Sequence, residues 1–316
     1  MPFRSFIYKV AEDGQDLLAD VHFTESSHNN ENKAIVLVFH AGGYTLGSRT
    51  LVPAATLRSL CARGFVVVSV DYRLCPHVSI WEGPMADARD ALQWARNALP
   101  GLLKKDAGVD IDGEKVMVFG QSSGATLALL LGGLPNPPRA IAALYGAAYF
   151  ADSVWSTPSP GAAMMPVVDR DFADKVYSEP PTSHAEFQTT QYLAPGQMPV
   201  PDLSKPRDAW MVLGFKEGNH LAKCVKDGNF ERVDPATYFR EEFPPTIFAT
   251  GTADHFIDPD CSRRMYEELR RLRVSTKLVT VEGGDHGFDF GIDEEDANFQ
   301  SGVVPVLEFL EEYVNS

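Results

Sequence analysis

Short runs of consecutive apolar residues constrain the fold of this chain more than any other feature of its sequence. Each run is bounded by glycine, proline or polar residues and is separated from the next by a segment of helical periodicity. A strand that is apolar at nearly every position buries both of its faces, which is typical of a parallel sheet covered by helices on both sides. The runs are AIVLVFH from Ala34, VVVSVDYR at 66–73, VMVFG at 116–120, RAIAALYG at 139–146, TIFATG at 246–251 and TKLVTVEG at 276–283.

Helical segments alternate with these runs. The predicted helices cover 54–63, 83–99, 122–133, 259–272 and 303–314. Strands and helices that alternate in this way predict an α/β fold with a doubly wound, mostly parallel sheet. We expect one catalytic domain, formed by 1–146 and 244–316 of the 316 residues.

The alternation stops between residues 147 and 243, where prolines cluster and no long strand run is found. This segment begins and ends at strand ends, so we expect a mostly helical lid over the carboxyl ends of the strands, where open α/β sheets bind ligands. A peripheral decoration or a homodimer surface is the alternative. Its larger apolar side chains either line a pocket or pack the lid onto the sheet: Trp155, Met164, Met165, Phe172, Tyr177, Phe187, Tyr192, Met198 and Trp210.

Composition limits the partners and the compartment. A formal net charge of −15 argues against nucleic acid, which needs clustered Lys and Arg. The N-terminus lacks the apolar core of a signal peptide, and no apolar stretch is long enough for a membrane span, so we expect a cytoplasmic protein. Scattered cysteines are usually buried and reduced in that compartment, and we expect this of Cys61, Cys75, Cys224 and Cys261.

The pentapeptide GQSSG at 120–124 carries the strongest chemical signal. It follows the strand VMVF directly and opens an apolar helix, which is the setting of a nucleophile elbow. The glycines two residues before and after Ser122 fit a turn too tight for side chains, and the turn holds the serine in strained backbone geometry. Ser122 is therefore the predicted nucleophile.

A serine hydroxyl needs a general base, and the base needs a third group to fix its tautomer. Asp254 follows the strand TIFAT and His286 follows the strand KLVTV, in the required chain order. Both loops lie at the same sheet edge as Ser122, so we predict His286 as the base and Asp254 as the orienting acid.

Other residues are weaker candidates for these roles. Asp258 is the best alternative acid, whereas Asp285 is adjacent to the base and is expected to point away from it. The remaining histidines lie in loops or in the insertion, or follow the predicted acid directly, and we expect surface or structural roles for them: His28, His184, His220 and His255.

A glycine pair follows the strand AIVLVF, in the sequence HAGG at 40–43. Such a loop supplies backbone N–H donors to a tetrahedral intermediate, because glycine permits close approach of the substrate. We predict the amides of Gly42, Gly43 and Ser123 as the oxyanion hole.

Taken together, these motifs resemble the hormone-sensitive-lipase branch of the α/β-hydrolases, the fold-3 group. The resemblance rests on HAGG at 40–43, DYRLCP at 71–76, GQSSG at 120–124, GTAD at 251–254 and DHGF at 285–288, and spans most of the chain outside the insertion. It implies the α/β-hydrolase fold and an acyl-enzyme mechanism without a cofactor, as in the carboxylesterases, lipases, amidases and lactonases of the family.

The chain departs from the family pattern at several positions. Ala41 replaces the usual first glycine, Gln121 and Ser123 change the commoner GDSAG, and His77 stands where an acidic residue is usual. Strand-like sequence begins near Phe6, where relatives often carry a helical cap segment. The pocket of this chain therefore has to be built chiefly by the insertion.

The predicted activity is hydrolysis of carboxylic esters or lactones of hydrophobic small molecules, with no metal ion. Tyr44, Phe256, Ile257 and Phe288 border the catalytic loops and are the predicted pocket wall. Two alternatives remain: biosynthetic acyl transfer or cyclisation by the same nucleophile, and a non-catalytic small-molecule receptor on a hydrolase scaffold.

Overall fold

The computed structural model describes residues 2–24, 33–187 and 194–315. His28 and Tyr192, which the sequence analysis considered, lie outside these residues. The described chain forms an eight-stranded sheet in the order β1-β2-β4-β3-β5-β6-β7-β8. The strands are β1 (Phe3–Val10), β2 (Asp16–His22), β3 (Lys33–Phe39), β4 (Val66–Val70), β5 (Ile111–Gln121), β6 (Ile141–Leu144), β7 (Thr246–Gly251) and β8 (Thr276–Val281).

The sheet reverses its winding at the β3/β5 pair. From β3 the chain runs outward through β4, and β5 then returns to the other side of β3. The two strands are parallel, with Phe39 level with Gly120. Their carboxyl ends therefore open side by side, at the kind of switch point where α/β sheets bind ligands.

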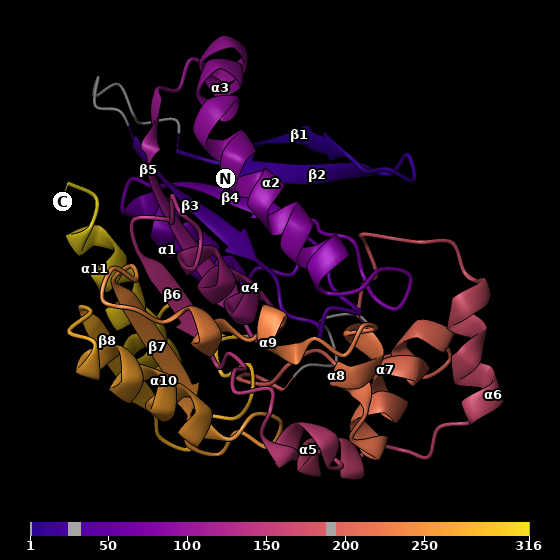
Figure 1. Ribbon diagram of the computed structural model, residues 1–316. Helices are drawn as coiled ribbons and strands as arrows, with labels where there is room; N and C mark the ends of the chain where they lie inside the picture. The colour runs from indigo at the N-terminus through magenta and orange to yellow at the C-terminus, as the bar shows by residue number, and fades with distance from the viewer. Residues whose placement is uncertain (1, 25–32, 188–193, 316) are drawn as a thin grey trace.

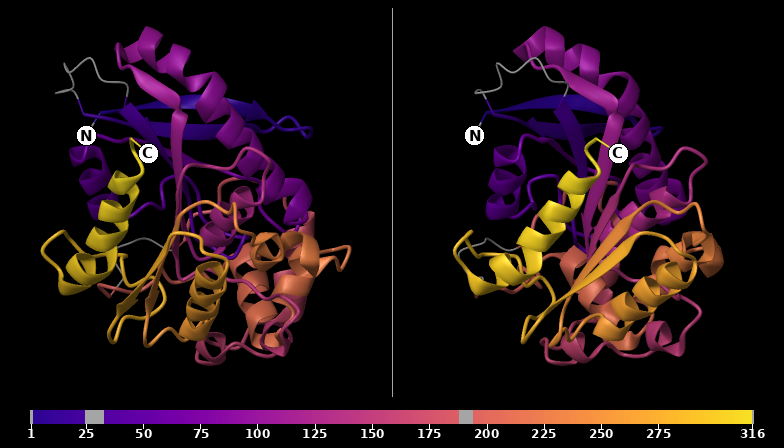
Figure 2. Two further views of the ribbon diagram at one scale, coloured as in Figure 1. Left: turned by 60° about the vertical axis from the view of Figure 1, so that its left-hand side comes forward. Right: turned by 90° about the vertical axis from the view of Figure 1, so that its left-hand side faces the viewer.

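Side chains of β3 show why both faces of the sheet are buried. Ile35, Leu37 and Phe39 point to one core, which contains residues of helices α2, α3, α4 and α10. Val36 and Val38 point to the other core, beneath helices α1 and α11, and Figure 2 shows these two helices together on one side of the sheet. The helices are α1 (Ala54–Ala62), α2 (Ala86–Asn97), α3 (Leu99–Ala107), α4 (Ser123–Gly132), α10 (Pro259–Arg271) and α11 (Val304–Glu312).

Between β6 and β7 the chain forms an insertion beyond the carboxyl ends of the strands (Figure 1), in which short helices are joined by turns and loops that make up more than half of its described residues. Among its described residues, only helix α7 exceeds five residues, so this part of the protein is held by contacts between short elements. Its helices are α5 (Pro160–Ala163), α6 (Arg170–Ala173), α7 (Pro206–Glu217), α8 (His220–Cys224) and α9 (Phe230–Val233), with 3₁₀ turns at Ser153–Ser156, Asp174–Ser178 and Pro235–Tyr238.

The predicted fold class is confirmed, and several element boundaries differ from the prediction, most clearly at β5 and α2. Strand β5 begins five residues earlier than predicted, and its pairing with β3 shifts register between Lys33 and Ile35. The helix predicted over 83–99 starts as a π-helical turn at Trp81–Met85 that contains Pro84, and it ends at Asn97. A proline that removes one backbone donor is compatible with the wider hydrogen-bond spacing of such a turn.

All four cysteines are free and buried. Among the described residues, no helix is both long and apolar enough to cross a bilayer.

The close contact between α4 and β3 predicts the effect of a substitution at Gly124. A Cβ added at Gly124 would lie 2.2 Å from the carbonyl oxygen of Phe39, so Gly124→Ala should lower the free energy of unfolding by roughly 2 kcal/mol or more. Gly101, inside helix α3, has no atom within 4 Å of an added Cβ, so Gly101→Ala should be neutral or raise stability by up to about 1 kcal/mol. Denaturant unfolding measures both, and equal stabilities for the two variants would contradict the packing described.

Candidate active site

Ser122 stands at the sharp turn between β5 and α4, with φ 52° and ψ −119°. Such a positive φ is costly for a residue with a side chain and persists only where the surroundings impose it. A Cβ at Gly120 would meet the carbonyl oxygen of Gly124 at 2.2 Å, so the two motif glycines allow the turn to close. The turn presents the Ser122 hydroxyl at the carboxyl end of the sheet.

His286 links Ser122 to Asp254. Its Nε2 lies 3.0 Å from the Ser122 Oγ, and its Nδ1 lies 2.8 Å from an Asp254 carboxylate oxygen. The other Asp254 oxygen accepts the backbone N–H groups of Phe256 and Ile257, each at 2.8 Å, and the carboxylate is fully buried. A carboxylate fixed in this way requires the proton on Nδ1, which leaves Nε2 free to accept a proton from the serine.

The alternative acids make other contacts. Asp258 caps helix α10 by accepting the backbone N–H of Asp260. Asp285 accepts the backbone N–H of His286 and pairs with the exposed ring of His255. Of the three carboxylates weighed from sequence, Asp254 is the one that contacts the His286 ring.

The loop after β3 brings two backbone N–H groups of the predicted oxyanion hole to the site. Gly42 has φ 128° and Gly43 has φ 59°, and a Cβ at Gly42 would overlap the carbonyl of Leu46. The Gly42 carbonyl accepts the N–H groups of Thr45 and Leu46, at 3.0 and 2.9 Å. This polarises the peptide whose N–H belongs to Gly43, making it a stronger donor. Ser123 adds the N–H of the first residue of α4, a group without an intrahelical partner.

His40 anchors the start of this loop. Its ring stacks on Tyr72 with centroids 4.1 Å apart, and the Tyr72 hydroxyl donates to the His40 carbonyl. Burial lowers the pKa of His40 to about 4, so the ring is neutral near pH 7, and its Nδ1 donates to the Ala41 carbonyl. These contacts fix the direction in which the chain leaves β3.

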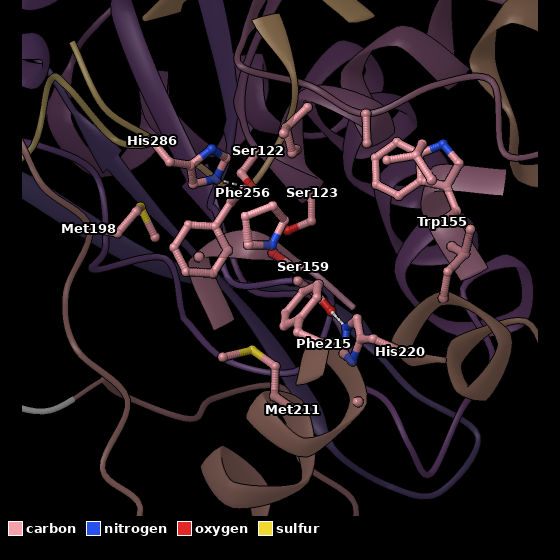
Figure 3. A pocket seen from close by; sticks show the side chains of 18 of the residues that line it. Ser122, Ser123, Trp155, Ser159, Met198, Met211, Phe215, His220, Phe256 and His286 are labelled. Carbon is pink, nitrogen blue, oxygen red and sulfur yellow. Dashed lines mark hydrogen bonds between the residues drawn. The ribbon is translucent and has the colours of Figure 1, made fainter. Parts of the chain in front are cut away.

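A cavity of about 970 Å³ covers Ser122 and His286 and is lined by Gly42, Gly43 and Ser123 as well. It is at the upper end of the usual size of small-molecule sites. In Figure 3, Phe256 lies close to His286, and Trp155 and Met198 lie on opposite sides. Among the apolar insertion residues named from sequence, five line the cavity: Trp155, Met164, Met165, Phe187 and Met198.

Of the predicted pocket wall, Tyr44, Phe256 and Ile257 line the cavity. The prediction for Phe288 is wrong. Gly287, at φ 79°, turns the chain, and the Phe288 ring enters the core beneath the site, edge-on to Tyr145 with centroids 5.5 Å apart. Within the insertion, Trp210 is also buried and donates to the Tyr177 hydroxyl.

Asp289 forms a buried network that the sequence analysis missed. Its carboxylate accepts the Tyr145 hydroxyl at 2.6 Å and the Gln121 amide at 2.5 Å. Tyr145 has a backbone φ of 41°, and its ring stands edge-on to the His286 ring with centroids 4.8 Å apart. Burial raises the pKa of Asp289 to about 6. One carboxyl group thus ties together the chain segments that present Ser122 and His286.

His220 is the second residue whose place differs from expectation. It is buried, lines the cavity and contacts the predicted oxyanion loop (residues 40–47) through its Nε2, which lies 2.8 Å from the Gly43 carbonyl oxygen. Across residues 2–24, 33–187 and 194–315, no group of three His, Cys, Asp or Glu side chains is placed to hold a metal ion.

A family model described as the alpha/beta hydrolase fold matches residues 36–217, more than half of the chain. The chain belongs to the α/β-hydrolase fold-3 family. The matched segment of this α/β hydrolase contains the predicted oxyanion loop and Ser122, whereas Asp254 and His286 lie beyond it.

Its sequence relatives include non-reducing polyketide synthases of fungi. It is 31% identical to adrD of Penicillium roqueforti over 336 residues and 39% identical to mapC of Penicillium brevicompactum over 347 residues. Each alignment covers 96% of this α/β hydrolase, which spans only 13% and 14% of the length of those two relatives.

Solved structures of similar fold include esterase 2 of Thermogutta terrifontis phosphonylated by sarin, at 19% identity and a TM-score of 0.60. The match covers 99% of this α/β hydrolase and 94% of the esterase. A Staphylococcus aureus protein of unknown function matches at 16% identity and a TM-score of 0.68, over 96% and 97% of the two chains. At these identities the matches show a shared fold.

The raised pKa of Asp289 predicts a pH-dependent stability difference. The ordinary pKa of 3.8 applies in the unfolded chain, whereas the folded chain holds Asp289 protonated up to about pH 6. The free-energy cost of ionising this buried carboxyl in the folded state is therefore small at pH 4, grows between about pH 4 and pH 6, and is complete above that range. Between pH 4 and pH 8, the unfolding free energy of Asp289→Asn should therefore rise relative to wild type, by about 2 to 3 kcal/mol.

Denaturant unfolding at both pH values measures this difference. Asp16→Asn, at an exposed carboxyl, is the control and should show little change relative to wild type between the two pH values. A pH-independent effect of Asp289→Asn would mean that Asp289 has the same pKa in both states.

Proposed function

We propose that this protein is a serine hydrolase that cleaves carboxylic esters or lactones of hydrophobic small molecules. The supporting observation is the hydrogen-bonded series Ser122–His286–Asp254 at the floor of a cavity of about 970 Å³. The fold of esterases such as that of Thermogutta terrifontis agrees with this chemistry without specifying the substrate.

In the first half-reaction, the Ser122 Oγ attacks the carbonyl carbon and its proton passes to the His286 Nε2. The carbonyl oxygen becomes an oxyanion, held by the N–H groups of Gly42, Gly43 and Ser123. Collapse of the intermediate breaks the bond to the leaving oxygen, which takes the proton from His286 and departs as an alcohol. Asp254 stabilises the imidazolium while it exists.

In the second half-reaction, water attacks the acyl-enzyme and gives one proton to His286. The bond to the Ser122 Oγ breaks, the serine regains that proton, and the free acid leaves. The aromatic and methionine side chains of the cavity favour a bulky, uncharged acyl group over a small polar one.

Replacing the nucleophile tests this proposal. Ser122→Ala should lower the rate of p-nitrophenol release from acetate, butyrate and octanoate esters by roughly 10⁴-fold or more and abolish fluorophosphonate labelling. Ser301→Ala, at an exposed serine of the π-helical turn Phe299–Val303, should match wild type.

Activity retained by Ser122→Ala would overturn the assignment of the nucleophile. If the wild type shows no fluorophosphonate labelling and no turnover, the result favours a small-molecule receptor on this fold. The relative rates for the acetate, butyrate and octanoate esters measure the acyl chain length that the pocket accepts best.

A second candidate function is acyl transfer or cyclisation, and the sequence relatives favour it. They are polyketide synthases, and the similarity extends over nearly the whole of this chain. In such a reaction, a hydroxyl group within the bound acyl chain replaces water at the acyl-enzyme stage.

Product analysis separates the two functions. With the p-nitrophenyl ester of a long hydroxy acid, the hydrolase proposal predicts the free acid as the main product. Formation of the lactone by wild type but not by Ser122→Ala would favour cyclisation instead. Addition of an alcohol or an amine tests intermolecular transfer in the same assay.

A further inference from the structure

The insertion and the oxyanion loop meet at Gly43. A Cβ added to this glycine would lie 3.3 Å from the Nε2 of His220, 3.3 Å from the Cζ of Phe215 and 3.5 Å from the Sδ of Met211. All three atoms belong to α7 and α8 of the insertion (Figure 3). The insertion therefore packs directly on Gly43, the residue whose N–H is a proposed donor to the oxyanion.

The Gly43 carbonyl accepts two hydrogen bonds, one from each side of this contact. The Thr45 hydroxyl, in the same loop, donates at 3.1 Å, and the Nε2 of His220 donates at 2.8 Å. Burial lowers the pKa of His220 to about 4, so its ring is neutral near pH 7. Because Nε2 faces a carbonyl oxygen, the single proton of the neutral ring sits on that nitrogen.

The His220 ring is fixed by its neighbours. It packs against the Phe215 ring with centroids 4.2 Å apart, and the Trp210 ring stands edge-on at 5.6 Å. On its other side, Gly214 leaves just enough room, since a Cβ there would come within 3.1 Å of the imidazole Nδ1. The donor therefore holds one orientation, set entirely by the insertion.

The adjacent residues of the oxyanion loop need this support. Gly42 and Gly43 both have positive φ, and a pair of glycines has many other accessible backbone conformations. The N–H groups of an oxyanion hole act only when they already point to where the charge develops. The hydrogen bonds to the Gly43 carbonyl fix the Gly43–Tyr44 peptide, and those to the Gly42 carbonyl fix the Gly42–Gly43 peptide that carries the Gly43 N–H. Gly43 is therefore held from both sides, and His220 supplies one of these hydrogen bonds.

We propose that His220 is a positioning residue for the oxyanion hole, and that it makes the geometry of the hole depend on the docked insertion. This inference rests on the proposed serine-hydrolase function. A second contact supports it: Ala185 of the insertion exchanges two backbone hydrogen bonds with Gly47, at the far end of the same loop.

Two substitutions at one position test the hydrogen bond. His220→Phe keeps an aromatic ring between Phe215 and Trp210 but removes the donor, whereas His220→Gln places an amide nitrogen near the position of Nε2. His184→Phe, at an exposed histidine of the insertion, is the matched control and should resemble wild type.

We expect His220→Phe to lower kcat for a p-nitrophenyl ester by roughly 10-fold to 100-fold, less than the loss of an oxyanion donor itself, with KM within about threefold. His220→Gln should recover most of kcat. A trifluoromethyl ketone inhibitor, whose carbonyl carbon bonds to the Ser122 Oγ and whose oxygen becomes an oxyanion, should lose affinity for His220→Phe in proportion to kcat/KM. Thermal unfolding of each variant records any loss of fold.

Wild-type kcat and inhibitor affinity in His220→Phe would overturn the inference. Equal losses in His220→Phe and His220→Gln would do so as well, because a merely structural role would not be rescued by the donor. The Ser122→Ala variant, assayed in parallel, separates this outcome from failure of the proposed function: only activity that survives that substitution contradicts the nucleophile.

Discussion

The parallel pairing of β3 with β5 is the constraint on which the candidate site depends. It places Phe39 level with Gly120, so the loop that carries Gly42 and Gly43 leaves the sheet beside the elbow that carries Ser122. The contact is close enough that Gly124 has no room for a side chain against the Phe39 carbonyl. The proposed nucleophile and the proposed oxyanion donors therefore belong to one structural unit, and the more distant β7 and β8 bring Asp254 and His286 to it.

Buried histidines and a buried carboxyl group set the distribution of charge and of hydrogen bonds around this unit. Burial leaves His40 and His220 neutral, so each acts as a hydrogen-bond donor that does not oppose the imidazolium that the proposed mechanism forms on His286. Asp289 holds Tyr145 beside the His286 ring and accepts the amide of Gln121 from the elbow. Gln121, which departs from the family motif, thus has a hydrogen-bond partner in Asp289. An amide at this position suits the neighbouring carboxylate better than a second carboxylate would.

The sequence contains enough information to predict the six parallel strands β3–β8, though not the antiparallel strands β1 and β2. It also brings Ser122, Asp254 and His286 together, because each follows a strand and parallel strands end at one edge. The sequence is less informative where the position of a side chain depends on a short turn or on contact with a residue far away in the chain. Phe288 was assigned to the pocket because it neighbours His286, but the turn at Gly287 sends it into the core. Asp289 is an ordinary residue in sequence, and only tertiary packing brings it to Tyr145, 144 positions away. His220 lies in an insertion without strand periodicity, so no pattern indicated which face of α8 meets the oxyanion loop.

The insertion leaves the sheet after β6 and returns at β7, and these two strands are direct neighbours. Its two ends are therefore close together, and a segment of different length or composition could replace it without moving any strand. Evolution can exchange such a segment to change the range of substrates while it retains the reacting groups. The proposed dependence of Gly43 on an imidazole from the insertion limits that freedom, because a replacement has to bring its own donor to the same carbonyl or leave this peptide without that hydrogen bond.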